Sequence, residues 1–197
     1  MANARRWSVW VLLLLLIAVF SAMWLVAKRN ESRRDIVVVG SVPALTMTSS
    51  SFADGSLIPA KFTCDGGDTS PQLSFSAPPA GTKSLVLIAD DQDAPAGVFV
   101  HWVVFNMPPG LLALAEGASA HPDMLQGAVQ GSNDFDKVGY GGPCPPGGSS
   151  HHYSFRVYAL DIRLGYAEGA TKNDVVRAAR GHVLAEGTLT GLYKRGQ

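Results

Sequence analysis

The stretch SLVLIADDQDAPAGVFVHWVVFNM, from Ser84 to Met107, determines the fold class. Its two apolar runs are short, rich in β-branched residues and separated by a turn that contains Pro95, so both are predicted to be buried strands. Two aspartates follow the first run, and His101 lies in the middle of the second. Because binding sites form where polar side chains converge in an otherwise apolar scaffold, we expect one wall of an anion-binding pocket here.

Further short strands are predicted on both sides of this stretch. Upstream, apolar pieces at 45–48, 57–58 and 73–75 are separated by Gly, Pro, Asp and Ser, which is typical of strands joined by turns. Downstream, residues 153–160 alternate between apolar and polar as a half-buried strand does, and residues 186–193 indicate a last strand. The chain is therefore predicted to be mostly β.

Helices are predicted to be few. Thr171 can cap a helix over 171–184, with Asp174 at the capping-box position, and residues 111–116 are a shorter helical candidate. Between the strands, residues 131–150 are rich in glycine and proline and are predicted to form a long loop. Loops of this length inside a compact domain are usually either functional or disordered.

The N-terminal segment carries a different signal. Residues 7–27 have no charge, and roughly 20 apolar residues suffice for a helix to cross a bilayer. A cleaved signal peptide is the alternative, although its apolar core is usually about 7–15 residues long. We predict an uncleaved membrane anchor (a signal-anchor) with a juxtamembrane segment over 1–35. A membrane-anchored domain over 36–197 is then expected on the extracytoplasmic side, in the periplasm or at the cell surface.

Charge excludes one class of partner. The formal net charge is zero, but residues 1–35 hold six of the sixteen basic side chains and only two acidic ones. The remaining residues carry ten basic and fourteen acidic side chains and contain no basic stripe. A mildly acidic domain of this kind is not expected to bind nucleic acid.

Three groups of polar residues can converge on one site. They are the pair Asp91 and Asp93, the imidazole of His101, and the segment with His151 and Tyr153 that follows the long loop. Imidazoles, backbone N–H groups and a tyrosine hydroxyl can all donate hydrogen bonds to a phosphate or carboxylate. The aspartates are expected to orient the imidazoles and to raise the fraction that is protonated. The structural alternatives are turn-capping aspartates and a hydrogen-bonded core histidine.

Other chemistry finds no motif in the sequence. No His-x-x-x-His or Cys-x-x-Cys pair supports a metal site, and no Gly-x-Ser-x-Gly elbow supports a serine hydrolase. No nucleophile is identified. We therefore expect neither an enzyme nor a cofactor.

Cys64 and Cys144 are the only cysteines. In an oxidising compartment they can form a disulfide that closes a loop of about eighty residues, and in a reducing compartment they are two buried thiols. The residues themselves leave both possibilities open.

Several motifs in order resemble one family. They are SSSFADGSLIPAKFTCDGGDTSPQLSF, the DQDAP turn, HWVVFNMP, GSNDFDKVGYGGPCPPGG, HHYSFRVYALD and GHVLAEGTLTGLY, which together span about residues 45–195. The chain resembles the phosphatidylethanolamine-binding protein family, in particular its bacterial Raf kinase inhibitor-like branch. The resemblance implies a β-sandwich-like core with a few short peripheral helices and one small anion pocket. It implies that the pocket is lined by Asp91, Asp93, His101, Gly142, Pro145, Pro146, His151 and Tyr153.

Two positions depart from the family pattern. Gln92 stands where the family turn usually has a proline, which loosens the backbone between the two aspartates. His152 stands where the family strand usually has an arginine. Because successive strand residues face opposite sides, His152 is predicted to point away from the pocket.

The expected function follows from the residues and the resemblance together. We predict a membrane-anchored binding protein for phosphate-type or other small anionic ligands, which modulates a partner protein. The alternative is a protease-inhibitor-like or weakly hydrolytic role that uses the same Asp and His residues.

Overall fold

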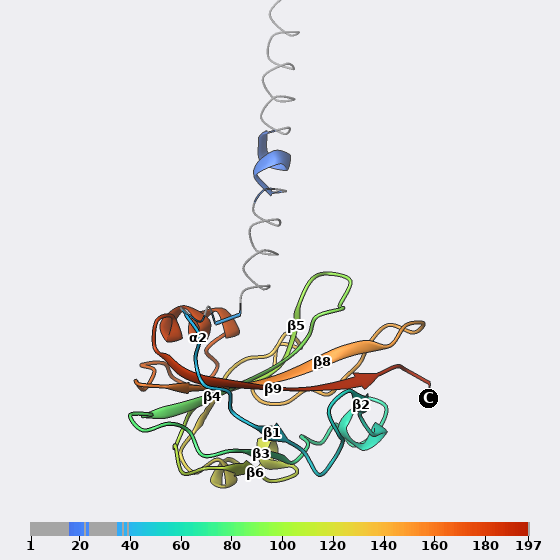
Figure 1. Cartoon of the computed structure of the whole chain (residues 1–197). Coiled ribbons are helices and arrows are strands. Elements are labelled where there is room, and N and C mark those ends of the chain that lie inside the picture. The colour runs from blue at the N-terminus through green and yellow to red at the C-terminus, as the bar shows by residue number, and fades with distance from the viewer. Residues whose placement is uncertain (1–15, 22, 24–34, 37, 39, 197) are drawn as a thin grey trace, which may run out of the picture.

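Six strands form the main sheet of the computed structural model, which describes residues 16–21, 23, 35–36, 38 and 40–196 (Figure 1). All neighbouring strands pair antiparallel except the first two in the spatial order, which are parallel. In that order the strands are β2 (Ser56–Leu57), β9 (Val183–Tyr193), β8 (His151–Leu160), β4 (Ser84–Asp91), β5 (Phe99–Met107) and β7 (Val129–Gln130).

A smaller sheet covers one face of the main sheet, and helix α2 (Lys172–Ala179) covers the other (Figure 1). The smaller sheet contains β1 (Met47–Thr48), β3 (Leu73–Phe75) and β6 (Ala113–Leu114). Three short 3-10 helices lie in the connections, namely η1 (Ala60–Phe62), η2 (Ala118–Ala120) and η3 (Pro122–Leu125). The prediction of a mostly-β fold with a few short helices is confirmed.

Each face of the main sheet has its own apolar core. The core between the two sheets contains Phe75, Trp102 and Phe155, and the core under α2 contains Val86 and Val175. Every residue of β4 is buried, as expected for a central strand that is covered on both faces. Burial on both faces explains why the run at Leu85–Ala89 is apolar throughout and does not alternate with polar residues.

Alternation along β4 sends its last two residues to opposite faces. Ala89 belongs to the core between the sheets and Ile88 to the core under α2. Because side chains alternate along a strand, Asp91 lies on the side of Ala89, and Asp90 lies on the side of Ile88. Two adjacent carboxylates therefore enter two different environments.

A β-bulge in β5 places His101 on the same face as Asp91. In the pairing with β4, Trp102 is opposite Ala89 and Val100 is opposite Asp90, so His101 is the additional residue. The bulge reverses the alternation, since Val100 belongs to the core under α2 whereas Trp102 belongs to the core between the sheets. Bulges commonly redirect a side chain beside a binding site, and this one directs the imidazole toward the end of β4.

Two helix predictions need correction. The helix predicted over 171–184 ends at Ala179, because Gly181 adopts φ of 80° and the chain then enters β9 at Val183. Its predicted capping box is present, with Thr171 and Asp174 bonding each other's backbone N–H groups. The helical candidate at 111–116 is wrong, because this segment contains strand β6, which pairs with β3. Strand pairing overrides the local helix propensity there.

The predicted membrane anchor also needs correction. No helix among the described residues is both long and apolar enough to cross a bilayer. Within 7–27 the structure describes residues 16–21 and 23, which are helical, and the rest of that segment lies outside the described residues. The membrane-spanning helix, and the membrane-anchored extracytoplasmic location that depended on it, are therefore contradicted.

Candidate functional site

The ends of three adjacent strands bring four predicted site residues together. Asp91 is the last residue of β4, His151 is the first residue of β8, and His101 lies at the bulge of β5. Asp91 is directly opposite Tyr153 in the β4–β8 ladder. All four are buried, and Tyr153 belongs to the core between the two sheets. We call Asp91, His101, His151 and Tyr153 the Asp91 cluster.

His151 is oriented by Asp91. Its Nδ1 lies 2.7 Å from Oδ2 of Asp91, and the two side chains are 4% and 5% exposed. An ionised carboxylate only accepts hydrogen bonds, so Nδ1 carries the proton and donates it. Nε2 is then the ring atom available to a ligand, and it accepts when the ring is neutral and donates when the ring is charged.

His101 is oriented by a backbone carbonyl. Its Nδ1 lies 2.6 Å from the carbonyl oxygen of Gly141, and the N–H of Gly141 donates to the carbonyl of His101 at 2.9 Å. A carbonyl only accepts, so Nδ1 is the donor here too. Burial lowers the pKa of His101, an effect larger than the opposing influence of the Gly141 carbonyl and of Asp91. The negative charge of Asp91 does raise the pKa of this imidazole, as predicted, but burial outweighs it and the pKa stays below its ordinary value.

Tyr153 carries a polar atom without a partner. The residue is 2% exposed, and its hydroxyl has no hydrogen-bond partner among the described residues. Its ring meets that of His101 edge-on, with centroids 5.2 Å apart. Burial, then the negative charge of Asp91 and the approach of the hydroxyl to that carboxylate, raise the pKa of Tyr153, so the hydroxyl keeps its proton. A buried hydroxyl that makes no hydrogen bond destabilises the fold by about 1–3 kcal/mol.

Two phenylalanines complete the surroundings of His101. The ring centroids of Phe99 and Phe135 lie 5.3 Å and 5.4 Å from that of His101, and 4.8 Å from each other. The sequence analysis did not identify either as a site residue. Phe99 could have been found from its position two residues before His101, whereas nothing local indicates that Phe135 packs against β5. Their apolar rings explain the desolvation that lowers the pKa of His101.

The long loop is held against the residues around Cys64. Cys64 and Cys144 form a disulfide with an S–S distance of 2.10 Å, which resolves the alternative that the sequence left open. The N–H of Gly142 donates to Oδ1 of Asp68 at 2.6 Å, so this amide is already bonded within the protein. A Cβ at Gly142 would lie 2.5 Å from the carbonyl oxygen of Phe62, so only glycine fits there.

The predicted prolines and Gly142 differ in their surroundings. Gly142 and Gly141 line a cavity of about 140 Å³, together with Cys64, Asp68, Phe135 and Lys137. Pro145 is buried and Pro146 is exposed, and both lie in the loop between Cys144 and β8. The described bonds of the Asp91 cluster do not involve either proline.

Asp93 does not orient the buried imidazoles. Its Oδ2 accepts from the backbone N–H of His152 at 2.8 Å and lies 2.6 Å from Nδ1 of the same residue. These bonds lower the pKa of Asp93. His152 is exposed, in agreement with its predicted direction away from the pocket. Asp93 contributes to the site indirectly, because its N–H donates to Oδ1 of Asp91 at 2.9 Å.

The comparisons with known proteins agree on one family. Residues 48–194 match the family described as phosphatidylethanolamine-binding protein. This match covers well over half of the sequence. The chain belongs to the phosphatidylethanolamine-binding protein family. Membership implies the binding of a small ligand.

Relatives and solved structures extend this finding. A UPF0098 protein of Methanothermobacter thermautotrophicus is 48% identical over 152 residues, which cover 77% of this chain and 100% of that protein. The crystal structure of a phosphatidylethanolamine-binding protein homologue from Chlamydia trachomatis is 43% identical, with a TM-score of 0.70 over 77% of this chain and 98% of that one. Escherichia coli YbcL, a member of the mammalian PEBP family, is 33% identical, with a TM-score of 0.72 over 76% and 98%.

Proposed function

We propose that the Asp91 cluster binds a small oxyanion, such as a phosphate-type head group. The observation that carries the proposal is the hydroxyl of Tyr153, which is buried and has no hydrogen-bond partner among the described residues. Native proteins satisfy nearly all such groups, so the hydroxyl is expected to donate to a bound molecule. Two further groups can contact the bound molecule, namely Nε2 of His101 and Nε2 of His151. In each ring Nδ1 is already bonded within the protein, so only Nε2 is available to a ligand.

Proton uptake accompanies binding in this proposal. A neutral imidazole with a proton on Nδ1 presents a lone pair at Nε2, which repels a fully ionised oxygen. An anion must therefore meet a protonated Nε2 or bring its own hydroxyl group. A phosphate monoester has its second pKa near about 6 and can do either. Phosphate-type groups thus suit the cluster better than carboxylates, which are fully ionised at neutral pH.

The experiment is calorimetric titration of the full chain with sulfate and with phosphoethanolamine. We expect both to bind saturably, with dissociation constants in the range of roughly micromolar to millimolar. Sulfate should bind more weakly than phosphoethanolamine at neutral pH, because it has no proton of its own and must meet a protonated Nε2. A well-folded protein that binds neither compound contradicts the proposal. In that case the alternative role as a protease inhibitor becomes the better hypothesis, and it predicts a stable complex with a protease instead.

Matched variants at one position test the role of Nε2. His101→Asn keeps an N–H group near the position of Nδ1, where it can still donate to Gly141, but removes Nε2. His101→Gln retains a polar atom near the position of Nε2. We expect the first variant to lose sulfate binding and the second to retain part of it. His182→Asn is the control, because that imidazole pairs with Asp161 at 41% exposure, outside the cluster.

A further inference from the structure

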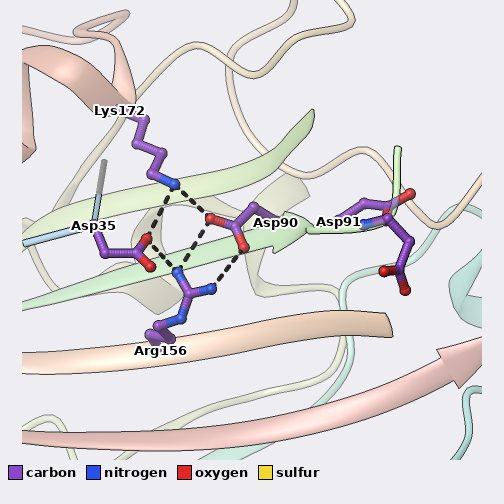
Figure 2. A network of polar contacts seen from close by, with 6 residues as sticks. Asp35, Asp90, Asp91, Arg156 and Lys172 are labelled. Atoms are coloured by element: carbon purple, nitrogen blue, oxygen red, sulfur yellow. Dashed lines mark hydrogen bonds and ion pairs between the residues drawn. The ribbon is translucent and has the colours of Figure 1, made fainter. Parts of the chain in front are cut away.

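A network of charged side chains lies on the opposite face of the main sheet. Asp90 is completely buried, and its carboxylate accepts hydrogen bonds from Lys172 at 2.6 Å and from Arg156 at 3.1 Å and 3.3 Å (Figure 2). Lys172 is 3% exposed and Arg156 is 10% exposed. These groups come from β4, α2 and β8. We call them, together with Asp35, the Asp90 network.

The buried part of this network has an excess of positive charge. Arg156 and Lys172 are two cations, and Asp90 is one anion. An uncompensated buried cation is strongly unfavourable, so the three residues require a second carboxylate. Asp35 provides it, because its Oδ1 accepts from both Arg156 and Lys172, the latter at 3.2 Å (Figure 2).

Asp35 differs from its three partners in position and exposure. It belongs to none of the described helices and strands, and its side chain is 43% exposed. The next residue, Ile36, is 4% exposed and joins the apolar core under α2. The sheet and the helix thus present a cationic position beside an apolar position, and two consecutive residues of the N-terminal segment occupy them.

We propose that Arg156, Lys172 and Asp90 form a binding site for a carboxylate followed by an apolar side chain. In this chain Asp35 and Ile36 fill the site, and an acidic–apolar segment of another polypeptide competes for it. The site does not depend on the Asp91 cluster, since Asp90 and Asp91 face opposite sides of β4. Its ligand class differs as well, because the two cations require an ionised carboxylate at neutral pH.

The test uses the full chain with Asp35→Ala and Ile36→Ala combined, which empties both positions, and the probe N-acetyl-Asp-Ile-amide. We expect the variant to melt at a lower temperature than the wild type and to bind the dipeptide saturably in calorimetry. The wild type is expected to bind it at least tenfold more weakly, because Asp35 occupies the position. Asp123→Ala is the matched control, since Asp123 is an exposed aspartate far from the network in the sequence, and it should behave as the wild type does.

Two further probes distinguish the sources of affinity. N-acetyl-Asn-Ile-amide lacks the charge and should not bind the double variant. Acetate lacks the apolar side chain and should bind the double variant more weakly than the Asp dipeptide does. Equal binding of the Asn and Asp dipeptides, or no saturable binding by the folded double variant, overturns the proposal. If acetate binds as strongly as the dipeptide, the assignment of the apolar position is overturned. Because these probes leave Lys172 unchanged, the test does not depend on whether a Lys172 variant folds.

Discussion

Asp90 and Asp91 are neighbours in the chain, yet they have different roles. In the Asp90 network the carboxylates of Asp90 and Asp35 each form ion pairs with the two cations, and both oxygens of Asp90 are bonded. In the Asp91 cluster, the carboxylate orients one imidazole, while the Tyr153 hydroxyl stays without a partner in the described part of the chain. The comparison teaches that burial of a carboxylate does not by itself show whether a site is vacant. The cations around Asp90 are already bonded to Asp35, whereas the Asp91 cluster keeps unused hydrogen-bonding groups for an external ligand.

The two faces are also held together differently. A disulfide fixes the loop beside the Asp91 cluster, whereas ion pairs join the elements around Asp90. If this distinction is correct, substitutions in the Asp91 cluster should mainly change anion binding, and substitutions in the Asp90 network should mainly change stability.

The largest effect is expected from the disulfide. Cys64 and Cys144 are separated by 80 residues, and removing a link of that span costs about 4–5 kcal/mol of unfolding free energy in the chain-entropy model. Denaturant unfolding in the presence and absence of dithiothreitol measures the difference. Unchanged stability, with both thiols shown to be free, would contradict this prediction. Reduction should also weaken sulfate binding, because Gly141 in the same loop orients His101.

The next effect is expected at Asp90. Asp90→Ala leaves Arg156 and Lys172 facing only the half-exposed Asp35, and the unfolding free energy should fall by about 3–5 kcal/mol. The matched variant is Asp91→Ala, which removes the hydrogen bonds that His151 and the Asp93 N–H donate to Asp91 on the other face. It should be less destabilising but should abolish sulfate binding. If the two variants lose the same unfolding free energy and the same sulfate affinity, the proposed difference between the two faces is contradicted.

A smaller effect is expected at Tyr153. Tyr153→Phe removes a hydroxyl that makes no bond in the described structure, so the unfolding free energy without ligand should rise by about 1–3 kcal/mol. A hydrogen bond to a charged ligand is worth about 1.5–3 kcal/mol, so the affinity for sulfate should fall by roughly 10–100-fold. Thermal unfolding and calorimetry on the same sample measure both. A loss of stability with unchanged affinity would indicate that the hydroxyl has a structural role.

The smallest effect is a dependence on pH. Burial holds the pKa of His101 in the folded state below its ordinary value of 6.5. Between that value and the lowered pKa the unfolded chain binds more protons than the folded chain, so stability should decrease as the pH falls through this window. Sulfate should counteract the decrease, because binding stabilises the protonated imidazole. Its affinity should rise by at most about tenfold per pH unit for one proton.

Melting temperatures across this pH range, with and without sulfate, measure both trends. Sulfate suits the purpose because its own charge stays constant there. His101→Asn should remove the influence of sulfate. A sulfate affinity that does not change with pH would mean that the anion is held without proton uptake.

Much of the fold could be predicted from the sequence, because it follows from local patterns. Apolar alternation and turn residues located β4, β5 and β8, and the capping box located the start of α2. The end of that helix was misplaced, since a left-handed Gly181 and a strand ladder determine it. The membrane anchor was inferred from apolar length alone, and the described part of the chain contradicts it.

At the site, the residue types could be predicted, but their partners could not. The sequence identified Asp91, His101, His151 and Tyr153 from their chemistry and from a family resemblance, and the structure gathers them at one end of the sheet. It assigned Asp93 the wrong imidazole, since the pairing with His152 depends on how the turn after β4 folds back. Gly141 and Phe135 were missed because both contact His101 across a long separation in sequence.

The sequence alone therefore determined the strand order in the chain, the chemistry available and the family, since these depend on residue type and local spacing. Only the tertiary structure decided which face of the sheet each carboxylate lies on and which ring nitrogen of each imidazole carries the proton. It also decided that the two cysteines are joined. The physical reason is that a one-residue bulge sets the direction of the His101 side chain, and the packing around it sets how far the imidazole is desolvated. Both arise from contacts between segments that are distant in the sequence.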